Sequence, residues 1–184
     1  MFEWLNAVLL QSGVGLAVAG AIGAVMFGGV GSAKGIAIAG AQAGGVLSEK
    51  PELFGKLLVM IALPGTQGFY ALICAIMIAL RIGLIDGKVV CSFYEGIALF
   101  AVGIGMGVVQ WRSAISQGEA SAAAIAMTAK KPEESGRAIL LPALVETYAV
   151  VALLAAILLI IWVTNPELTI VPAGPTTFPV PVGK

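Results

Sequence analysis

Four long apolar runs constrain the fold of this chain more than any other feature of its sequence. They occupy residues 9–46, 56–80, 96–129 and 138–163. Each is long enough to cross the hydrocarbon core of a bilayer, which takes roughly 20 helical residues. None alternates between apolar and polar residues with a period of two, as the strands of a membrane barrel do. The sequence therefore predicts an all-α membrane protein with four transmembrane helices.

The composition agrees with a membrane location. The 184 residues are 59% apolar and 11% charged, whereas a soluble domain carries roughly 25% charged residues. The net charge is zero and no long basic tract is present, so nucleic acid binding is not expected. The first residues, MFEWLNAVLL, lack the basic start of a secretory signal, so we expect the first helix to be retained.

Motifs for soluble chemistry are missing from the sequence. Cys74 and Cys91 have no CxxC context and no histidine partner, so we interpret them as small apolar side chains rather than a zinc site or a disulfide. No GxxxxGK[ST] phosphate loop is present. The chain is therefore not expected to be an enzyme on its own, to hydrolyse ATP or to carry an organic cofactor.

The two halves of the chain are alike. The matching segments are KPE at 50–52 and at 131–133, and LPGTQGFYAL (63–72) aligned with LPALVETYAV (141–150). We therefore expect two tandem helical hairpins, 9–80 and 91–163, as parallel repeats. Both run in the same direction because each contains an even number of crossings.

The loops and the tail complete the predicted topology. The two KPE loops carry more Lys and Arg than the loop that holds Arg81 and Lys88. The positive-inside rule then places the KPE loops in the cytoplasm and both termini outside, in a multi-pass protein of the cell membrane. The tail, residues 165–184, contains five prolines and is expected to be a loosely ordered extension.

Glycine is distributed unevenly among the four helices. Eleven of the 24 glycines fall in residues 9–46, and rows of small residues let helices approach closely in lipid. Packing within one chain explains any single row. However, the first and third helices are both glycine-rich, whereas the second and fourth are bulky. This asymmetry favours a tight inner circle of helices backed by a wider outer one, as in a homo-oligomeric ring.

One carboxylic acid interrupts the last apolar run. Glu146 has no charged neighbour between Arg137 and Glu167, and acids inside a membrane span are usually functional. Counted from the KPE turns, Gln67 and Gln117 lie at nearly the depth of this acid, all roughly 21–24 Å from their turns.

Further polar groups share this depth. Thr66 and Tyr70 lie on one face beside Gln67, and Pro64 and Gly65 loosen the helix just before them and free a backbone carbonyl. Each group has an ordinary alternative: a threonine bonded to its own helix, a glutamine that joins two helices, or a packed tyrosine. Their convergence on one level with the acid favours a binding site.

The chemistry of this set suggests the ligand. A dehydrated hard cation needs several oxygens to replace its water, whereas a proton needs one acidic acceptor in a dry pocket. One carboxylate, two amide oxygens, one hydroxyl and one carbonyl supply five oxygens and a single negative charge. That charge neutralises a monovalent ion and leaves a divalent ion unpaired. The set therefore predicts Na⁺, with a proton as the alternative.

The sequence resembles the membrane rotor proteolipids (c/K subunits) of V-type ATPases, in particular the sodium-translocating bacterial form. The segments that carry the resemblance are GSAKG (31–35), KPELFGK (50–56), LPGTQGFY (63–70), QGEASAAA (117–124), AKKPEE (129–134) and VETYA (145–149). They cover nearly the whole chain outside the tail. The Na⁺ ligands that the resemblance implies are Glu146, Gln67, Gln117, Thr66 and the carbonyl of Leu63, with Tyr70 bonded to the carboxylate.

The resemblance also implies an assembly and its partners. Identical chains would form a ring that turns against a membrane stator subunit with two half-channels, coupled through a central stalk to an ATPase head, with lipids inside the ring. Gly68 occupies the position of the first repeat that aligns with Glu146. Since glycine has no carboxylate, each chain would carry one ion. Glu119 and Arg112 depart from the expected pattern.

Two rival functions remain open at this point. One is a proton-translocating version of the same rotor. The other is a small four-helix drug or ion antiporter that works as a dimer around Glu146. Such antiporters line the acid with aromatic residues, and only Tyr70 and Tyr148 lie near it in the sequence. A purely structural role would leave the acid unexplained.

Overall fold

A computed structural model describes residues 2–165 and 167 of the chain. Over these residues it consists of helices joined by 3₁₀ turns (η) and a loop, without a strand. The elements are α1 (Phe2–Glu49), η1 (Pro51–Leu53), α2 (Phe54–Ala62), η2 (Leu63–Gly65), α3 (Thr66–Arg81), α4 (Phe93–Lys130), η3 (Pro132–Glu134), α5 (Ser135–Ala138) and α6 (Leu140–Val163). Of the tail predicted at 165–184, only Asn165 and Glu167 lie within the described residues.

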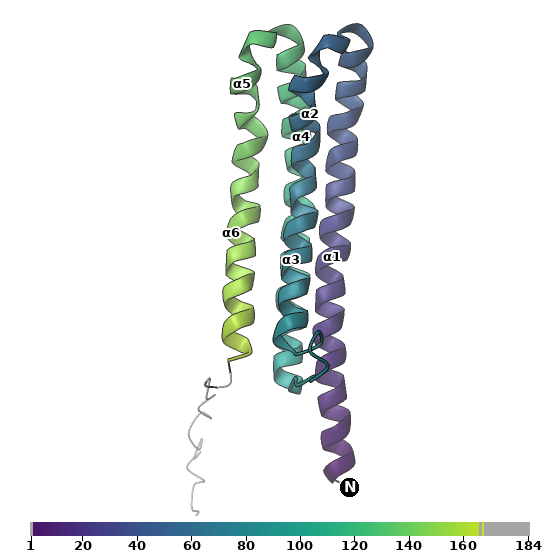
Figure 1. The fold of residues 1–184 in the computed structure, drawn as a ribbon, viewed down its shortest axis with the longest axis vertical. Helices are drawn as coiled ribbons and strands as arrows, with labels where there is room; N and C mark the ends of the chain where they lie inside the picture. The colour runs from purple at the N-terminus through teal and green to yellow at the C-terminus, as the bar shows by residue number, and fades with distance from the viewer. Residues whose placement is uncertain (1, 166, 168–184) are drawn as a thin grey trace, which may run out of the picture.

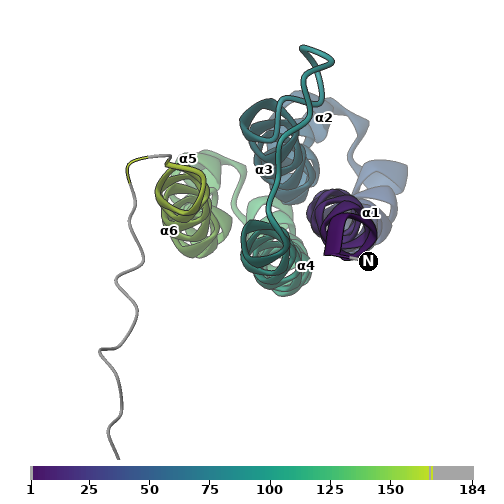
Figure 2. The ribbon, with the colours of Figure 1, turned by 90° about the horizontal axis from the view of Figure 1, so that it is seen from below.

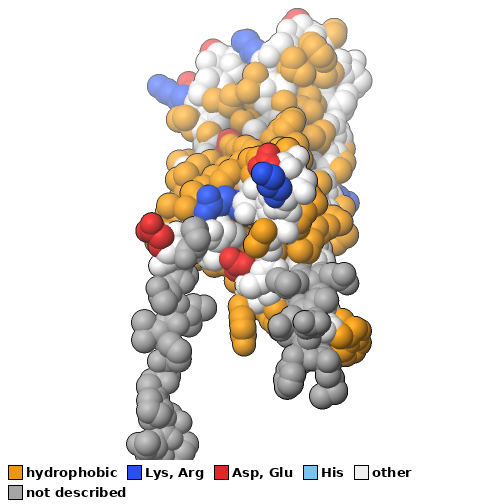
Figure 3. All heavy atoms as spheres, turned by 60° about the horizontal axis from the view of Figure 1, so that its bottom comes forward, with side chains coloured by type: hydrophobic (Ala, Val, Ile, Leu, Met, Phe, Trp, Pro, Cys, Tyr) orange, Lys and Arg blue, Asp and Glu red, His pale blue; other side chains and the backbone are white. Residues whose placement is uncertain are grey.

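Four segments of the described chain are long and apolar enough to span a membrane. They are Ser12–Glu49, Pro51–Arg81, Phe93–Lys130 and Pro132–Val163. The prediction of an all-α chain with four long apolar helices is therefore confirmed. In the most apolar window of the last span, only 22% of the residues are buried within the chain. Figure 3 shows hydrophobic side chains over much of the visible face, with most charged ones toward its two ends. Such a surface is suited to lipid or to further apolar partners.

The centre of the bundle is the contact between α1 and α4, which run side by side over most of their length (Figures 1 and 2). Glycines make this close approach possible. A Cβ atom on Gly20 would lie 2.6 Å from the Cα of Phe100, and one on Gly31 would lie 2.5 Å from the Cα of Trp111. Because the residue numbers rise together along both helices, α1 and α4 are parallel.

The helices α3 and α6 lie outside this central pair. Seen along the bundle, α3 lies against one side of the α1–α4 pair, while α6 lies beside α4 on the side away from α1 (Figure 2). Helix α6 packs mainly on α4 and less extensively on α3. The helix that carries Glu146 therefore has neighbours from its own chain on one side only.

Both KPE turns lie at the end of the bundle opposite the N-terminus (Figure 1). In each turn the proline occupies a starting position of a 3₁₀ turn, where its missing N–H costs nothing. Lys50 Nζ donates to the carbonyl of Ala129 (2.6 Å), and Lys56 Nζ donates to the carbonyl of Pro132 (2.9 Å). Lys50 of the first hairpin thus supplies positive charge to the C-terminal end of α4, where the helix dipole favours it.

The opposite end of the bundle is fixed by two side-chain arrangements. Ser92 and Glu95 form a capping box that starts α4: Ser92 Oγ accepts from Glu95 N (3.2 Å), and Glu95 Oε2 accepts from Ser92 N (2.6 Å). Arg81 Nε donates to Thr164 Oγ1 (2.7 Å), which ties the end of α3 to the end of α6. These contacts limit the axial movement of the helices that carry the polar set.

Candidate ion-binding site

The break between α2 and α3 positions the first polar groups. Pro64 has no N–H to donate, and the chain tightens into the 3₁₀ turn η2 before α3 begins at Thr66. Thr66 Oγ1 donates to the carbonyl of Leu63 (3.0 Å) and lies 3.4 Å from Gln67 Oε1. The carbonyl, the hydroxyl and the first amide oxygen of the predicted set therefore lie together at this break.

The two glutamines of the predicted set are fully buried and bonded to each other. Gln67 Nε2, from α3, donates to Gln117 Oε1, from α4, over 2.6 Å. Gln117 Nε2 in turn donates to the carbonyl of Pro142 in the first turn of α6 (2.9 Å). A chain of amides thus joins three helices at one level of the bundle.

The acid bonds to the tyrosine that the family resemblance pairs with it. Tyr70 OH, from α3, donates a hydrogen bond to Glu146 Oε1, from α6. The carboxyl group is half-buried rather than enclosed. Within the described chain no hydrogen bond joins Glu146 to Gln67 or Gln117. However, Gln67 lies one turn before Tyr70 in α3, and Pro142 lies one turn before Glu146 in α6. The glutamine pair bonded to Pro142 and the tyrosine bonded to the acid therefore lie at neighbouring levels of the α3–α6 contact.

The surroundings of this set distinguish it from other kinds of site. The described residues contain no group of three or more His, Cys, Asp or Glu side chains that could hold a metal ion. Tyr148 is 77% exposed and turned away from the bundle core, so it does not line the acid as an aromatic wall would. Arg112 and Glu119 are exposed on α4. The set therefore combines neutral oxygen groups with a single carboxylate, which Tyr70 contacts.

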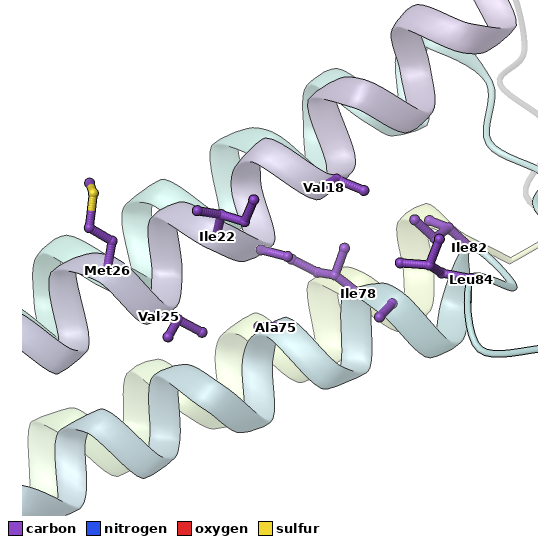
Figure 4. Close-up of a pocket in the computed structure, with 10 residues that line it drawn as sticks. Val18, Ile22, Val25, Met26, Ala75, Ile78, Ile82 and Leu84 are labelled. Atoms are coloured by element: carbon purple, nitrogen blue, oxygen red, sulfur yellow. The ribbon is translucent and has the colours of Figure 1, made fainter.

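A large apolar groove lies away from the polar set. It encloses about 440 Å³ between α1 and α3, toward the loop that follows α3 (Figure 4). Val18 and Ile22 line it from α1, and Ile78 and Ile82 line it from the other side. Because its lining is wholly apolar, it offers no ligand to an ion.

Sequence reasoning missed one buried polar residue next to this set. Gln110 is fully buried, and its Nε2 donates to the carbonyl of Ala149 in α6 (2.9 Å). It lies seven residues before Gln117, so the two side chains share one face of α4. That spacing was visible in the sequence. The depth count nevertheless passed over Gln110, because it considered only groups level with the acid.

Comparisons with known proteins agree with this architecture. The sequence profile of the ATP synthase C-subunit family matches residues 19–78 and 90–159, one match in each repeat. The chain is 36% identical over 161 residues to V-type sodium ATPase subunit K of Enterococcus hirae, which covers 88% of this chain and 99% of that protein.

Two further relatives are subunits of an A-type ATP synthase and of a V-type proton ATPase. The chain is 39% identical over 149 residues to A-type ATP synthase subunit K of Methanocaldococcus jannaschii (79% of this chain and 63% of that protein). It is 27% identical over 142 residues to the 16 kDa proteolipid of the V-type proton ATPase of Nephrops norvegicus (77% and 87%). With its duplicated hairpin and the profile match in each half, this chain belongs to the ATP synthase C-subunit family, the membrane rotor proteolipids of rotary ATPases.

Proposed function

We propose that this chain is the rotor-ring subunit of a rotary ATPase and that it carries Na⁺ across the membrane on Glu146. One observation carries the proposal: the acid that interrupts the last span lies across the α3–α6 contact from a bonded pair of buried glutamines, and Tyr70 holds it there. The relative from Enterococcus hirae, named as a sodium ATPase subunit, supports the same assignment.

The donor set suits a monovalent hard cation. In the proposed site the carboxylate supplies the charge, and the other oxygens replace the water that Na⁺ loses. These ligands are Glu146, Gln67, Gln117, Thr66 and the carbonyl of Leu63. Tyr70 orients the carboxylate without contacting the ion. A divalent ion would keep an uncompensated positive charge in a region where unpaired charge is costly.

Neutralisation of the carboxylate explains how such a ring can turn. An ion enters through one half-channel of a stator subunit and pairs with the acid, which then faces lipid without a net charge. After nearly a full turn it leaves through the second half-channel. Moving one ion against 100 mV takes about 2.3 kcal/mol, which an ATPase head supplies through a central stalk. In this proposal the KPE turns face the cytoplasm, the termini face outside, identical chains form the ring, and lipids fill its centre.

A proton-carrying rotor is the second candidate, and two observations favour it. The two glutamine amides bond to each other, and neither bonds to the acid. In addition, the relative from Nephrops norvegicus is named as part of a proton ATPase. A proton would need only the carboxyl group and its Tyr70 contact.

Labelling by a carbodiimide separates the two candidates. This reagent modifies protonated carboxyl groups in apolar surroundings, so a bound Na⁺ ion protects Glu146. We expect millimolar Na⁺, but not the same concentration of K⁺, to slow labelling of the purified ring at constant pH. Glu146→Gln is the control and should abolish both labelling and ATP-driven uptake. Protection by raised pH alone, with no effect of Na⁺, would establish the proton as the ion.

A further inference from the structure

Two glutamines of α4 hold α6 in the same manner. Gln117 Nε2 donates to the carbonyl of Pro142, and Gln110 Nε2 donates to the carbonyl of Ala149, each over 2.9 Å. The two donors lie seven residues apart, and so do the two acceptors. Seven residues make two helical turns, so both bonds belong to one register of the antiparallel α4–α6 pair.

Glu146 lies between these two bonds. It follows Pro142 by four residues and precedes Ala149 by three. The stretch of α6 that carries the acid is thus attached to α4 at both of its ends. We propose that Gln110 is a positioning residue for the ion site, which fixes the height and rotation of α6 so that the acid faces α3. This inference rests on the proposed Na⁺ function.

Helix α6 gains from such a constraint because its hydropathy alone does not define its rotation. Apart from Glu146, Thr147 and Tyr148, residues 140–163 are apolar on every side. An apolar surface of this kind packs almost equally well in several rotations, whereas a hydrogen bond holds only one. A slip of one residue would move the carboxyl group by about 1.5 Å along the axis and turn it by about 100°, away from Tyr70.

Burying Gln110 costs free energy, and this cost supports a specific role for the amide N–H group that bonds to α6. Its Oε1 is buried and has no hydrogen-bond partner among the described residues, which is unfavourable. An apolar side chain of similar volume would fill the same space without that penalty. Packing therefore does not account for the glutamine, whereas the bond from Nε2 to α6 does.

Gln110 is too far along α4 to be a ligand of the same ion. Seven residues separate it from Gln117, which amounts to roughly 10 Å along the helix axis. Its effect on the site must therefore act through the position of α6.

The test uses the assembled ring with Gln110→Met, which keeps the volume and removes the donor, and with Gln110→Asn, which is too short to reach Ala149. Thr128→Val is the matched control, because Thr128 is also a buried polar residue of α4, but its side-chain hydroxyl donates to Met60 Sδ of α2 (3.8 Å) and not to α6. The readouts are the Na⁺ concentration that half-protects Glu146 from the carbodiimide and the Na⁺ dependence of ATP-driven uptake.

We expect both Gln110 variants to raise the half-protecting Na⁺ concentration by about tenfold, the effect of losing one buried hydrogen bond. The half-saturating Na⁺ for uptake should rise equally, with the maximal rate within about twofold. Thr128→Val should change neither.

Unchanged protection in assembled rings of both variants would overturn the inference while leaving the Na⁺ function intact. So would failure of both variants to form rings when Thr128→Val forms them, because Gln110 would then serve folding alone. If Na⁺ does not protect the unaltered ring, the proposed function fails, and this inference fails with it.

Discussion

Substituting Gly118 by alanine tests whether the close contact between α1 and α4 positions the ion site. A Cβ atom at this residue would lie 2.5 Å from the carbonyl oxygen of Gly35 and 2.6 Å from its Cα. Both atoms belong to the backbone of α1, so no flexible side chain can move aside. Ordinary carbon contacts are roughly 3.5 Å, and the two helices must therefore separate by about 1 Å.

The separation of α1 from α4 would stretch the site, because α3 is bonded to α1 on one side and to α4 on the other. The backbone N–H of Gly68 donates to Ser32 Oγ of α1 (2.8 Å), whereas Gln67 bonds across to Gln117 of α4 (2.6 Å). When α4 moves away by about 1 Å, the amide bond exceeds the usual hydrogen-bond length. We expect a loss of about 1–3 kcal/mol in stability from overpacking and roughly tenfold weaker Na⁺ protection from the lost buried bond.

Two measurements and one control check this reasoning. The temperature at which the ring dissociates in detergent reports stability, and carbodiimide labelling of Glu146 reports Na⁺ affinity. Gly55→Ala, in α2, is the control, because the Cβ it would add meets no atom of another helix within 4 Å among the described residues. If Gly118→Ala rings dissociate at the unaltered temperature and bind Na⁺ normally, then the contact between α1 and α4 does not set the geometry of the site.

The remaining predictions concern three other groups. Tyr70→Phe keeps the ring packing but removes a charge-assisted hydrogen bond to Glu146, so Na⁺ protection should weaken by at least about tenfold; a normal protection curve would contradict the orienting role of the hydroxyl. Lys50→Met removes a donor from the C-terminal end of α4 and should lower the stability of the ring by about 1 kcal/mol, measured by thermal dissociation. Burial first, and the charge of Glu95 second, raise the pKa of Cys91 to about 11. Its thiol therefore stays neutral at pH 8, and alkylation by iodoacetamide should speed up about tenfold per pH unit from 8 to 10; a rate that levels off below pH 9 would refute this.

The helices could be predicted from sequence because the bilayer limits what a chain can do. A long apolar run in lipid must satisfy its own backbone hydrogen bonds, and the helix does so within one segment. The ends were harder to locate. Helix α1 begins at Phe2 and ends at Glu49, beyond both limits of its apolar run, because the backbone bonding of a helix continues through polar residues where hydropathy falls.

Residue spacing alone predicted the depth of the site but not its hydrogen bonds, and the bond from Tyr70 to Glu146 was expected only from the family resemblance. A count of residues from the KPE turns placed Gln67 and Gln117 level with each other, and the structure bonds them. The same count could not assign the partner of each amide, since a glutamine has both donor and acceptor groups and three helices lie within reach. For this reason the bonds from Gln117 to Pro142 and from Gln110 to Ala149 emerged only from the structure.

The structure also shows that Gly68 and Glu146, the matching positions of the two repeats, have different surroundings. At Gly68, α3 lies so close to α1 that an added Cβ would stand 3.3 Å from Ser32 Oγ, and that hydroxyl already accepts the N–H of Gly68. The counterpart of Ser32 in the second repeat, by the spacing of the KPE turns, is Ser113 of α4. Its buried hydroxyl has no hydrogen-bond partner among the described residues. A bond from the backbone to a serine hydroxyl therefore joins α3 to α1 at this position in the first repeat. In the second repeat, Ser113 makes no such bond within the described residues, and Glu146 stands at the matching place of α6. The two matching positions thus differ in their hydrogen bonding to the neighbouring helix, and a single acid lies at this level in each chain.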